Sequence, residues 1–318
     1  MKKLLFLLAC WPMSVSAADL PGIPEFIDEM VAKHQFSRSE LVTLFDGAQH
    51  RPSIIEAITK PATKKPWPEY RAIFVNPQRL KACVAFQQQY RTELQRAEDK
   101  FGVPQEIIVA LIGVETLFGK NMGSYRVLDA LTTLAFDYPR RAPFFRAELE
   151  NYLLLLREQQ LDWREVKGSY AGAIGYPQFM PSSYRKYAVD FNGNRRVDLR
   201  NEVEDAIGSV ANYLREYGWQ PNEPVAIPAR VRGEVPLNML ENKTTQTLVA
   251  WAKQDVRSEE AVAFNRSARL VRFALGSEEQ FWLGFNNFDV ITRYNTSDYY
   301  AMAVFQLSEA LRAETGRR

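Results

Sequence analysis

The chain has 318 residues, of which 46% are hydrophobic and 25% are charged, a composition typical of a globular protein with room for two or three domains. Its 40 Lys and Arg residues nearly balance 38 Asp and Glu residues, which argues against nucleic acid as a partner. The two histidines, His34 and His50, give little support to a zinc site or a Ser-His-Asp triad.

Residues 1–18 have the pattern of an export signal. Lys2 and Lys3 precede a short apolar run at 4–11, and small residues at 15–18 offer a cleavage site. The apolar run is too short to span a bilayer, so we expect cleavage and release into the periplasm of a Gram-negative bacterium. Removal of the two leader lysines leaves 38 basic residues against 38 acidic ones.

The segment 7–10 also resembles a lipobox, in which an acylated Cys10 would bring the protein into peripheral contact with the outer membrane. The short apolar region before Cys10 and the proline at position 12 favour ordinary cleavage, so we expect a soluble protein. Cys83 is then the single cysteine, and no internal disulfide is expected. Its expected role is that of a small core residue on a helix.

The pattern of the remaining chain predicts a mainly helical body with a small mixed insertion. Short helices are expected over 23–57, and an irregular loop or small hairpin over the glycine-marked stretch 168–183. Longer helices are predicted at 79–100, 104–118, 125–136, 143–159, 203–217 and 299–312, and one short helix is predicted at 245–254. Strand-like segments are predicted at 225–227, 231 and 270–273.

Glu115 is the candidate catalytic group. Ile107, Leu111 and Glu115 are each four residues apart on the helix expected over 104–118, so Glu115 shares a face with apolar side chains. Burial there would raise the pKa of the carboxyl and let it act as a general acid. Spacing alone leaves open a buried glutamate that caps another group or pairs with Arg140 or Arg141.

Four separated motifs give this glutamate a context. They are GVETLFG at 113–119, LDALTTLAFDYPRR at 128–141, GSYAGAIGYPQFMPSSY at 168–184 and TRYN at 292–295. In this order they closely resemble the lytic murein transglycosylase B family (glycoside hydrolase family 103), and the resemblance runs from about Tyr70 to Leu307. It implies an α+β, mainly α fold, with a lysozyme-like core, a helical domain and a small inserted β-containing domain.

The resemblance also implies domain boundaries. The helical domain would comprise 19–100, 203–218 and 289–318. The lysozyme-like catalytic core would comprise 101–202, and a small α/β insertion would comprise 219–288.

The implied reaction is cleavage of the MurNAc–GlcNAc β-1,4 bond of peptidoglycan glycan strands with formation of 1,6-anhydroMurNAc. Glu115 would be its sole acid and base, assisted by the N-acetyl group of the substrate, and no cofactor would be required. The other plausible acids, Asp129 and Asp137, lie beside segments that look structural. The residues implied or proposed to bind substrate are Tyr70, Arg140, Arg141, Ser169, Gln178, Tyr213, Tyr294, Asn295 and Tyr300. A monomer is expected.

Two alternatives remain open at this point. A hydrolytic muramidase would yield a hydrated reducing end, and a noncatalytic peptidoglycan-binding scaffold would cleave nothing. The retention of Glu115 on an apolar face argues against the scaffold.

The segment 190–205 resembles the start of an EF-hand loop. Its candidate ligands are Asp190, Asn192, Asn194 and Arg196, and the resemblance to the family implies Asp205 as the closing group. It departs from a strong site because Arg195 replaces the sixth-position glycine, and because one extra residue shifts the closure. A weak Ca²⁺ site and a turn that keeps its shape without metal both remain possible.

Overall fold

The computed structural model describes residues 20–60, 65–234 and 237–316. The chain divides into two compact units. The first comprises Met1–Lys60, Gly123–Ala173 and Met180–Ser182, and the second comprises Pro61–Met122, Ile174–Phe179 and Ser183–Arg318. The predicted export signal and Cys10 lie outside the described residues. No helix within the described ranges is long and apolar enough to cross a membrane.

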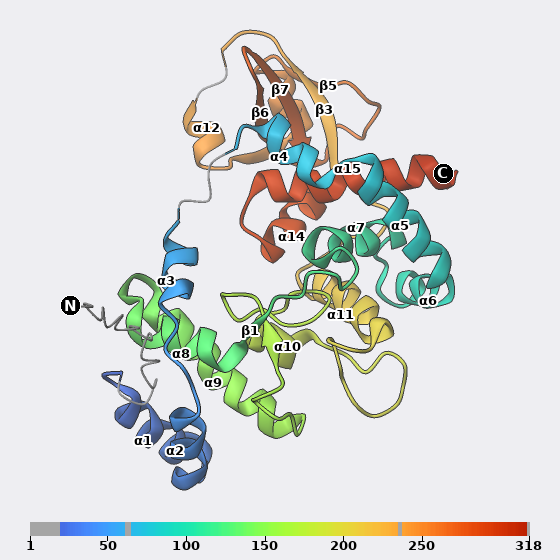
Figure 1. The fold of residues 1–318 in the computed structure, drawn as a ribbon. Helices are drawn as coiled ribbons and strands as arrows, with labels where there is room; N and C mark the ends of the chain where they lie inside the picture. The colour runs from blue at the N-terminus through green and yellow to red at the C-terminus, as the bar shows by residue number, and fades with distance from the viewer. Residues whose placement is uncertain (1–19, 61–64, 235–236, 317–318) are drawn as a thin grey trace, which may run out of the picture. The chain divides into compact units, whose positions relative to one another are not determined.

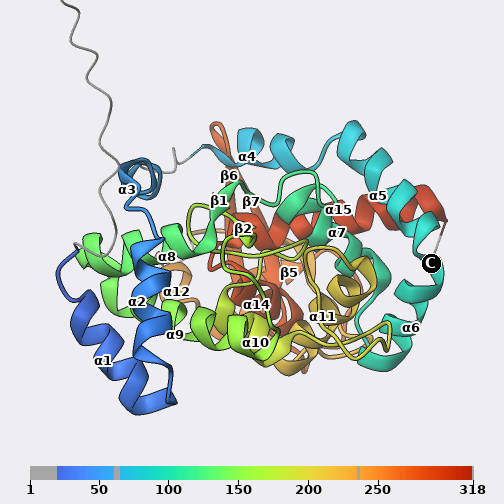
Figure 2. The same ribbon diagram turned by 60° about the horizontal axis from the view of Figure 1, so that its bottom comes forward.

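The first unit is helical. Its elements are α1 (Ile23–His34), α2 (Arg38–Asp46), α3 (Pro52–Thr59), α8 (Val127–Asp137), a short 3-10 helix (Pro139–Arg141), α9 (Ala142–Glu158), and the paired strands β1 (Tyr125–Arg126) and β2 (Lys167–Gly168). The helix α10 (Pro181–Tyr187) continues from this unit into the second. Figure 2 shows α1 and α2 as neighbouring helices, and α8 packs on α9 and α3. The short helices expected over 23–57 are confirmed.

In the second unit a central helix, α7 (Gln105–Thr116), packs against four other helices, α5 (Pro77–Gln89), α6 (Arg91–Phe101), α11 (Val203–Glu216) and α15 (Asp298–Thr315). The others are α4 (Trp67–Phe74), α12 (Leu237–Glu241), α13 (Leu248–Ala252) and α14 (Asn286–Tyr294). Cys83 is fully buried in α5, as predicted, and burial raises the pKa of its thiol to about 12.

An antiparallel five-stranded sheet completes this unit, in the order β4-β6-β7-β3-β5 (Figure 1). Its strands are β3 (Ala226–Val231), β4 (Thr245–Thr247), β5 (Val256–Ser258), β6 (Ser267–Leu275) and β7 (Glu278–Gly284). Ile227, Leu270 and Leu283 form its core with Trp251, whose indole N–H donates to the Ala268 carbonyl at 2.8 Å. All five strands lie in the stretch predicted to be a mixed insertion. The predicted domain boundaries themselves remain a prediction.

Three predicted helices were wrong in detail. The helix expected over 79–100 is two helices, because Tyr90 leaves helical geometry (φ −110°, ψ 32°) between α5 and α6. The helix expected over 245–254 begins later, because residues 245–247 form a strand that pairs with β6. The side chain of Thr247 then caps α13 by accepting a hydrogen bond from the Ala250 N–H. Residues 125–126 likewise pair with β2 before α8 begins. The expected fold class, α+β and mainly helical, is confirmed.

Candidate active site

Glu115 is the one place where α7 opens to solvent. The other eleven residues of this twelve-residue helix are buried, whereas Glu115 is partly exposed. The predicted apolar stripe is not set apart from a polar face, because the helix is buried on all sides. A carboxyl placed here is strongly desolvated and can still meet a substrate.

The end of α7 is fixed by a left-handed turn. Leu117, Phe118 and Gly119 all have positive φ, so the helix ends at Thr116, two residues before the predicted Phe118. The Thr116 hydroxyl accepts from the Gly119 N–H and donates to the Tyr176 carbonyl, each at 3.0 Å. A Cβ on Gly119 would lie 2.4 Å from the Tyr176 ring, so this position requires glycine.

These contacts fasten the loop 174–179 to the residues that follow Glu115. Thr116 and Tyr176 are therefore functional supports that the sequence analysis missed. The threonine directly after Glu115 and the glycine after Phe118 were the available signals. Neither signal identified the distant partner, which is 60 positions away along the chain.

The direct partner of Glu115 is Tyr300, at the start of α15. The Tyr300 hydroxyl, on a residue only 3% exposed, donates to Glu115 Oε1 at 2.5 Å. Burial raises the pKa of Glu115 from 4.5 to about 7, and the hydrogen bond from Tyr300 opposes that rise. Within this unit Glu115 is therefore hydrogen-bonded to a neutral phenol and is not paired with an arginine.

Further tyrosines surround the carboxyl. The Tyr294 ring stacks on that of Tyr300 with centroids 6.4 Å apart, and its hydroxyl donates to the Pro177 carbonyl at 2.6 Å. Tyr213, 5% exposed, packs on Tyr294 and donates to the Arg293 carbonyl at 2.7 Å. Burial, followed by the charge of Glu115, raises the pKa of Tyr294 and of the half-buried Tyr70. Both phenols are therefore neutral neighbours of Glu115.

Gln178 and Asn295 are the other predicted groove residues in this unit. Gln178 adopts φ 50°, and its side-chain amide donates to the carbonyls of Gly175 at 2.9 Å and Met122 at 3.2 Å. The side chain is thus held in place, because two backbone carbonyls fix its amide. Asn295 is exposed and directly follows α14.

Ser169, Arg140 and Arg141 belong to the first unit. The Ser169 hydroxyl accepts from the N–H groups of Ala171 at 3.2 Å and Ala173 at 3.0 Å, which fixes the turn it begins. Arg140 is exposed, and Arg141 lies over the Phe144 ring at 4.3 Å.

Asp129 and Asp137 are engaged inside the same unit. Asp129 is 1% exposed, receives hydrogen bonds from the Arg126 guanidinium and the Gln49 N–H, and lies near Arg51. Asp137 pairs with His50 at 2.8 Å. Both acids tie the segment before α3 to α8, so their geometry is that of structural groups.

Two of the predicted ligands of the 190–205 loop, Asp190 and Asp205, are engaged by backbone N–H groups. Asp205 is fully buried and accepts three backbone N–H groups, from Phe191, Asn192 and Asp198. The Asp190 carboxylate also accepts three, all from residues 193–195. No group of three or more His, Cys, Asp and Glu residues in the described ranges is arranged to hold a metal ion. The donor set therefore does not fit a strong calcium site.

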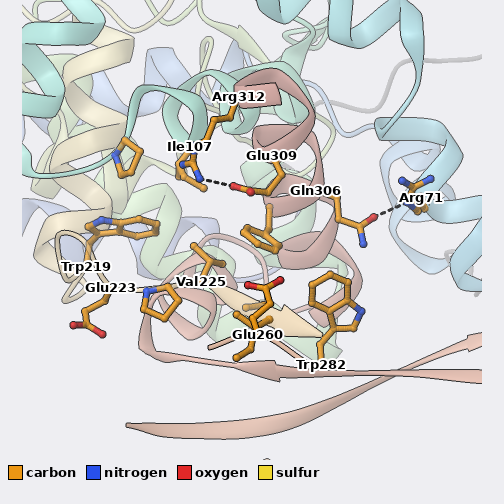
Figure 3. Close-up of a pocket in the computed structure, with 15 residues that line it drawn as sticks. Arg71, Ile107, Trp219, Glu223, Val225, Glu260, Trp282, Gln306, Glu309 and Arg312 are labelled. Carbon is orange, nitrogen blue, oxygen red and sulfur yellow. Dashed lines mark hydrogen bonds and ion pairs between the residues drawn. The ribbon is translucent and has the colours of Figure 1, made fainter. Parts of the chain in front are cut away.

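A cavity of about 510 Å³ lies at the opposite end of α7, next to Ile107 (Figure 3). Eight residues separate Ile107 from Glu115, which is about 12 Å of helix. Trp219, Phe305 and Trp282 line the cavity, and two paired contacts border it, Arg71 with Gln306 at 2.5 Å and Arg312 with Glu309 at 2.7 Å. It contains none of the predicted site residues, so we do not include it in the active site.

Comparison with known proteins identifies the family. Residues 20–309 match the family described as "Transglycosylase SLT domain". The chain is 43% identical over 304 residues to the membrane-bound lytic murein transglycosylase B of Escherichia coli K12, covering 92% of this chain and 83% of that protein. This chain belongs to the lytic transglycosylase family.

Solved transglycosylases have the same fold. The crystal structure of E. coli Slt35 in complex with calcium superposes with a TM-score of 0.88 at 42% identity, covering 96% of this chain and 97% of that one. Pseudomonas aeruginosa SltB3 in complex with NAG-anhNAM-pentapeptide superposes with a TM-score of 0.83 at 28% identity, covering 91% and 78%. The family and the enzymatic nature expected of this transglycosylase are confirmed.

Proposed function

We propose that this transglycosylase cleaves the β-1,4 bond between MurNAc and GlcNAc of peptidoglycan without water and leaves a 1,6-anhydroMurNAc end. Glu115 is its only acid and base. The observation that carries the proposal is the Glu115 carboxyl, which is partly exposed and has a pKa of about 7. No second carboxylate among the described residues contributes to the shift of that pKa. A group with this pKa both donates and accepts a proton near neutral pH.

In the first step, the protonated Glu115 donates its proton to the glycosidic oxygen, and the bond from that oxygen to C1 of MurNAc breaks. The carbonyl oxygen of the substrate's own N-acetyl group forms a new bond to C1. The second carboxylate of an ordinary glycosidase is therefore not needed. The resulting Glu115 carboxylate balances the positive charge on the cyclised acetamido group.

In the second step, the Glu115 carboxylate takes the proton of the C6 hydroxyl of MurNAc. The C6 oxygen attacks C1 and expels the acetamido oxygen, which closes the anhydro ring. Glu115 is again protonated and ready for the next cycle. No water enters the product, and the hydrogen bond from Tyr300 stabilises the carboxylate between the two steps.

We assign two kinds of role to the neighbouring residues. Tyr213 and Tyr300 are almost fully buried, with hydroxyls engaged inside the protein, so they position Tyr294 and Glu115 respectively. The remaining predicted residues, more exposed, contact the glycan strand directly, and Asn295 and Ser169 are the donors proposed for the acetamido group. The direct contacts are Tyr70, Arg140, Arg141, Ser169, Gln178, Tyr294 and Asn295.

Mass spectrometry of the fragments released from purified sacculi tests the reaction. The proposal predicts MurNAc ends lighter by one water than the hydrated product, because the C6 hydroxyl replaces water. Hydrated ends would identify a hydrolytic muramidase, and a lack of digestion would identify a noncatalytic scaffold. Either result contradicts the proposal.

The change Tyr300→Phe tests the pairing with Glu115. Loss of the hydrogen bond should raise the pKa of Glu115 further, because that bond lowers it in the wild type. The wild-type rate should fall as pH rises through about 7, where the acid form of Glu115 is lost. In the variant the basic limb of the pH–rate profile should move to higher pH. The value of kcat should fall roughly tenfold, because the Glu115 carboxylate formed between the two steps is less stable without this hydrogen bond.

The pH dependence of kcat/KM measures this shift. Tyr213→Phe is the matched control, because it also removes a buried phenol hydroxyl, yet that hydroxyl contacts a backbone carbonyl. An unchanged basic limb in Tyr300→Phe, or an equal shift in Tyr213→Phe, would refute the assigned role.

We also propose that the enzyme acts in the periplasm as a monomer. The leader pattern in residues 1–18 supports export, and ordinary cleavage after Ala17 or Ala18 supports a soluble form. Contact with the outer membrane then requires acylation of Cys10. Labelled palmitate incorporated into the wild type but not into Cys10→Ser would establish the lipoprotein instead.

A further inference from the structure

The loop over 190–205 has an internal arrangement that the sequence did not indicate. The Asp190 carboxylate opens it and accepts the N–H groups of Gly193 at 2.7 Å, Asn194 at 3.1 Å and Arg195 at 2.7 Å. Three backbone donors stabilise this charge without any ion. Arg195, in the place of the usual glycine, adopts the left-handed φ of 72° that the turn requires.

Glu202, rather than Asp205, closes the loop. The Glu202 carboxylate accepts from the side-chain amide of Asn192 at 2.8 Å and from that of Asn194 at 3.0 Å. These asparagines occupy the third and fifth positions counted from Asp190, where an EF-hand offers oxygen ligands. The charge of Asp205 is directed instead to three backbone N–H groups.

The carboxylate of Asp198 accepts the N–H groups of Arg200 at 3.0 Å and Asn201 at 3.2 Å, and Asp198 and Glu202 both also contact a cationic side chain. The Arg196 guanidinium reaches both, with Nη2 3.0 Å from Asp198 Oδ2 and 3.4 Å from Glu202 Oε1. Arg200 adds a longer contact to Asp198, at 3.8 Å. Arg196 is the seventh residue of the loop, and its side chain bridges the ninth and thirteenth.

We propose that Arg196 supplies, from within the chain, the positive charge that a divalent cation supplies in an EF-hand loop. The loop then keeps its shape without calcium. A fixed guanidinium between the two carboxylates also repels a second cation at the same place. The proposal is independent of the role assigned to Glu115.

Thermal unfolding in millimolar CaCl₂ and in EDTA tests the proposal. The wild-type Tm should be the same in both. Arg196→Ala should lower the Tm in EDTA by about 2 °C, because a partly exposed guanidinium that contacts two carboxylates is lost. CaCl₂ should restore most of that loss, because the ion then takes the place of the missing guanidinium.

Arg195→Ala is the matched control. This change removes an adjacent exposed guanidinium that contacts no carboxylate in the described part of the chain. The Tm of this variant should therefore stay near that of wild type and should not change when CaCl₂ is added. Isothermal titration with CaCl₂ should give no binding heat for the wild type and measurable binding for Arg196→Ala. A calcium-stabilised wild type, an Arg196→Ala protein as stable as wild type in EDTA, or one that calcium does not rescue would each overturn the proposal.

Discussion

Glu115→Gln is expected to lower kcat on purified sacculi about a thousandfold while the protein still folds and binds glycan, because an amide neither donates nor accepts the proton. The loss should exceed that of ordinary glycosidase variants with one carboxylate left, since both steps use this single group. The near-isosteric amide retains an oxygen that accepts the hydrogen bond from Tyr300. KM should therefore change little.

Turnover is measured by release of soluble fragments, and binding by sedimentation with sacculi. Glu106→Gln is the matched control, because Glu106 is a buried glutamate of the same helix at the end remote from Glu115. It should keep kcat near that of wild type. Substantial residual turnover in Glu115→Gln, or an equal loss in Glu106→Gln, would overturn the assignment of a single acid and base.

The same substitution is expected to stabilise the folded protein at high pH. The folded-state pKa of Glu115 is raised from 4.5 to about 7, so its ionisation opposes folding. The stability that the neutral carboxyl contributes is fully present below pH 4.5 and is lost as pH rises through about 7. Glutamine stays neutral throughout. The free energy of unfolding of the variant should therefore exceed that of wild type at pH 8 by up to about 3 kcal/mol.

Urea unfolding of both proteins measures this difference. At roughly pH 3.5 the two curves should nearly coincide, because wild-type Glu115 is then protonated in both the folded and the unfolded states. The comparison at this pH is the internal control for any effect that the change of side chain itself has on stability. A difference that does not grow with pH, or a variant less stable than wild type at pH 8, would contradict the raised pKa.

The sequence indicated the proposed catalytic region because the signals there are local. GVETLFG marks Glu115, and the apolar spacing before it indicates burial. The all-round burial of α7 was not visible, because it depends on α5, α11 and α15, which come from distant parts of the chain. Neither was the role of Tyr300, since its hydroxyl meets Glu115 across 185 positions. The sequence does not distinguish a tyrosine whose side chain contacts a sugar from one whose hydroxyl donates a hydrogen bond to a carboxyl.

The loop over 190–205 illustrates the same limit. Alternating oxygen-bearing residues indicated an EF-hand-like turn, and the turn is present. The resemblance to the family indicated Asp205 as the closing group. The extra residue instead brings Glu202 to the asparagines and leaves Asp205 to the backbone. The break of the predicted long helix at Tyr90 has a comparable origin, because α5 and α6 each follow their own packing partners.

Digestion of sacculi in water labelled with the heavy isotope of oxygen tests the central claim most directly. If Glu115 works alone and the C6 hydroxyl closes the ring, the new MurNAc ends should carry no label. The number of anhydro ends should then equal the number of bonds cleaved. Incorporation of one labelled oxygen for each cleaved bond would mean that water is the nucleophile, and it would contradict the lytic mechanism derived from this site.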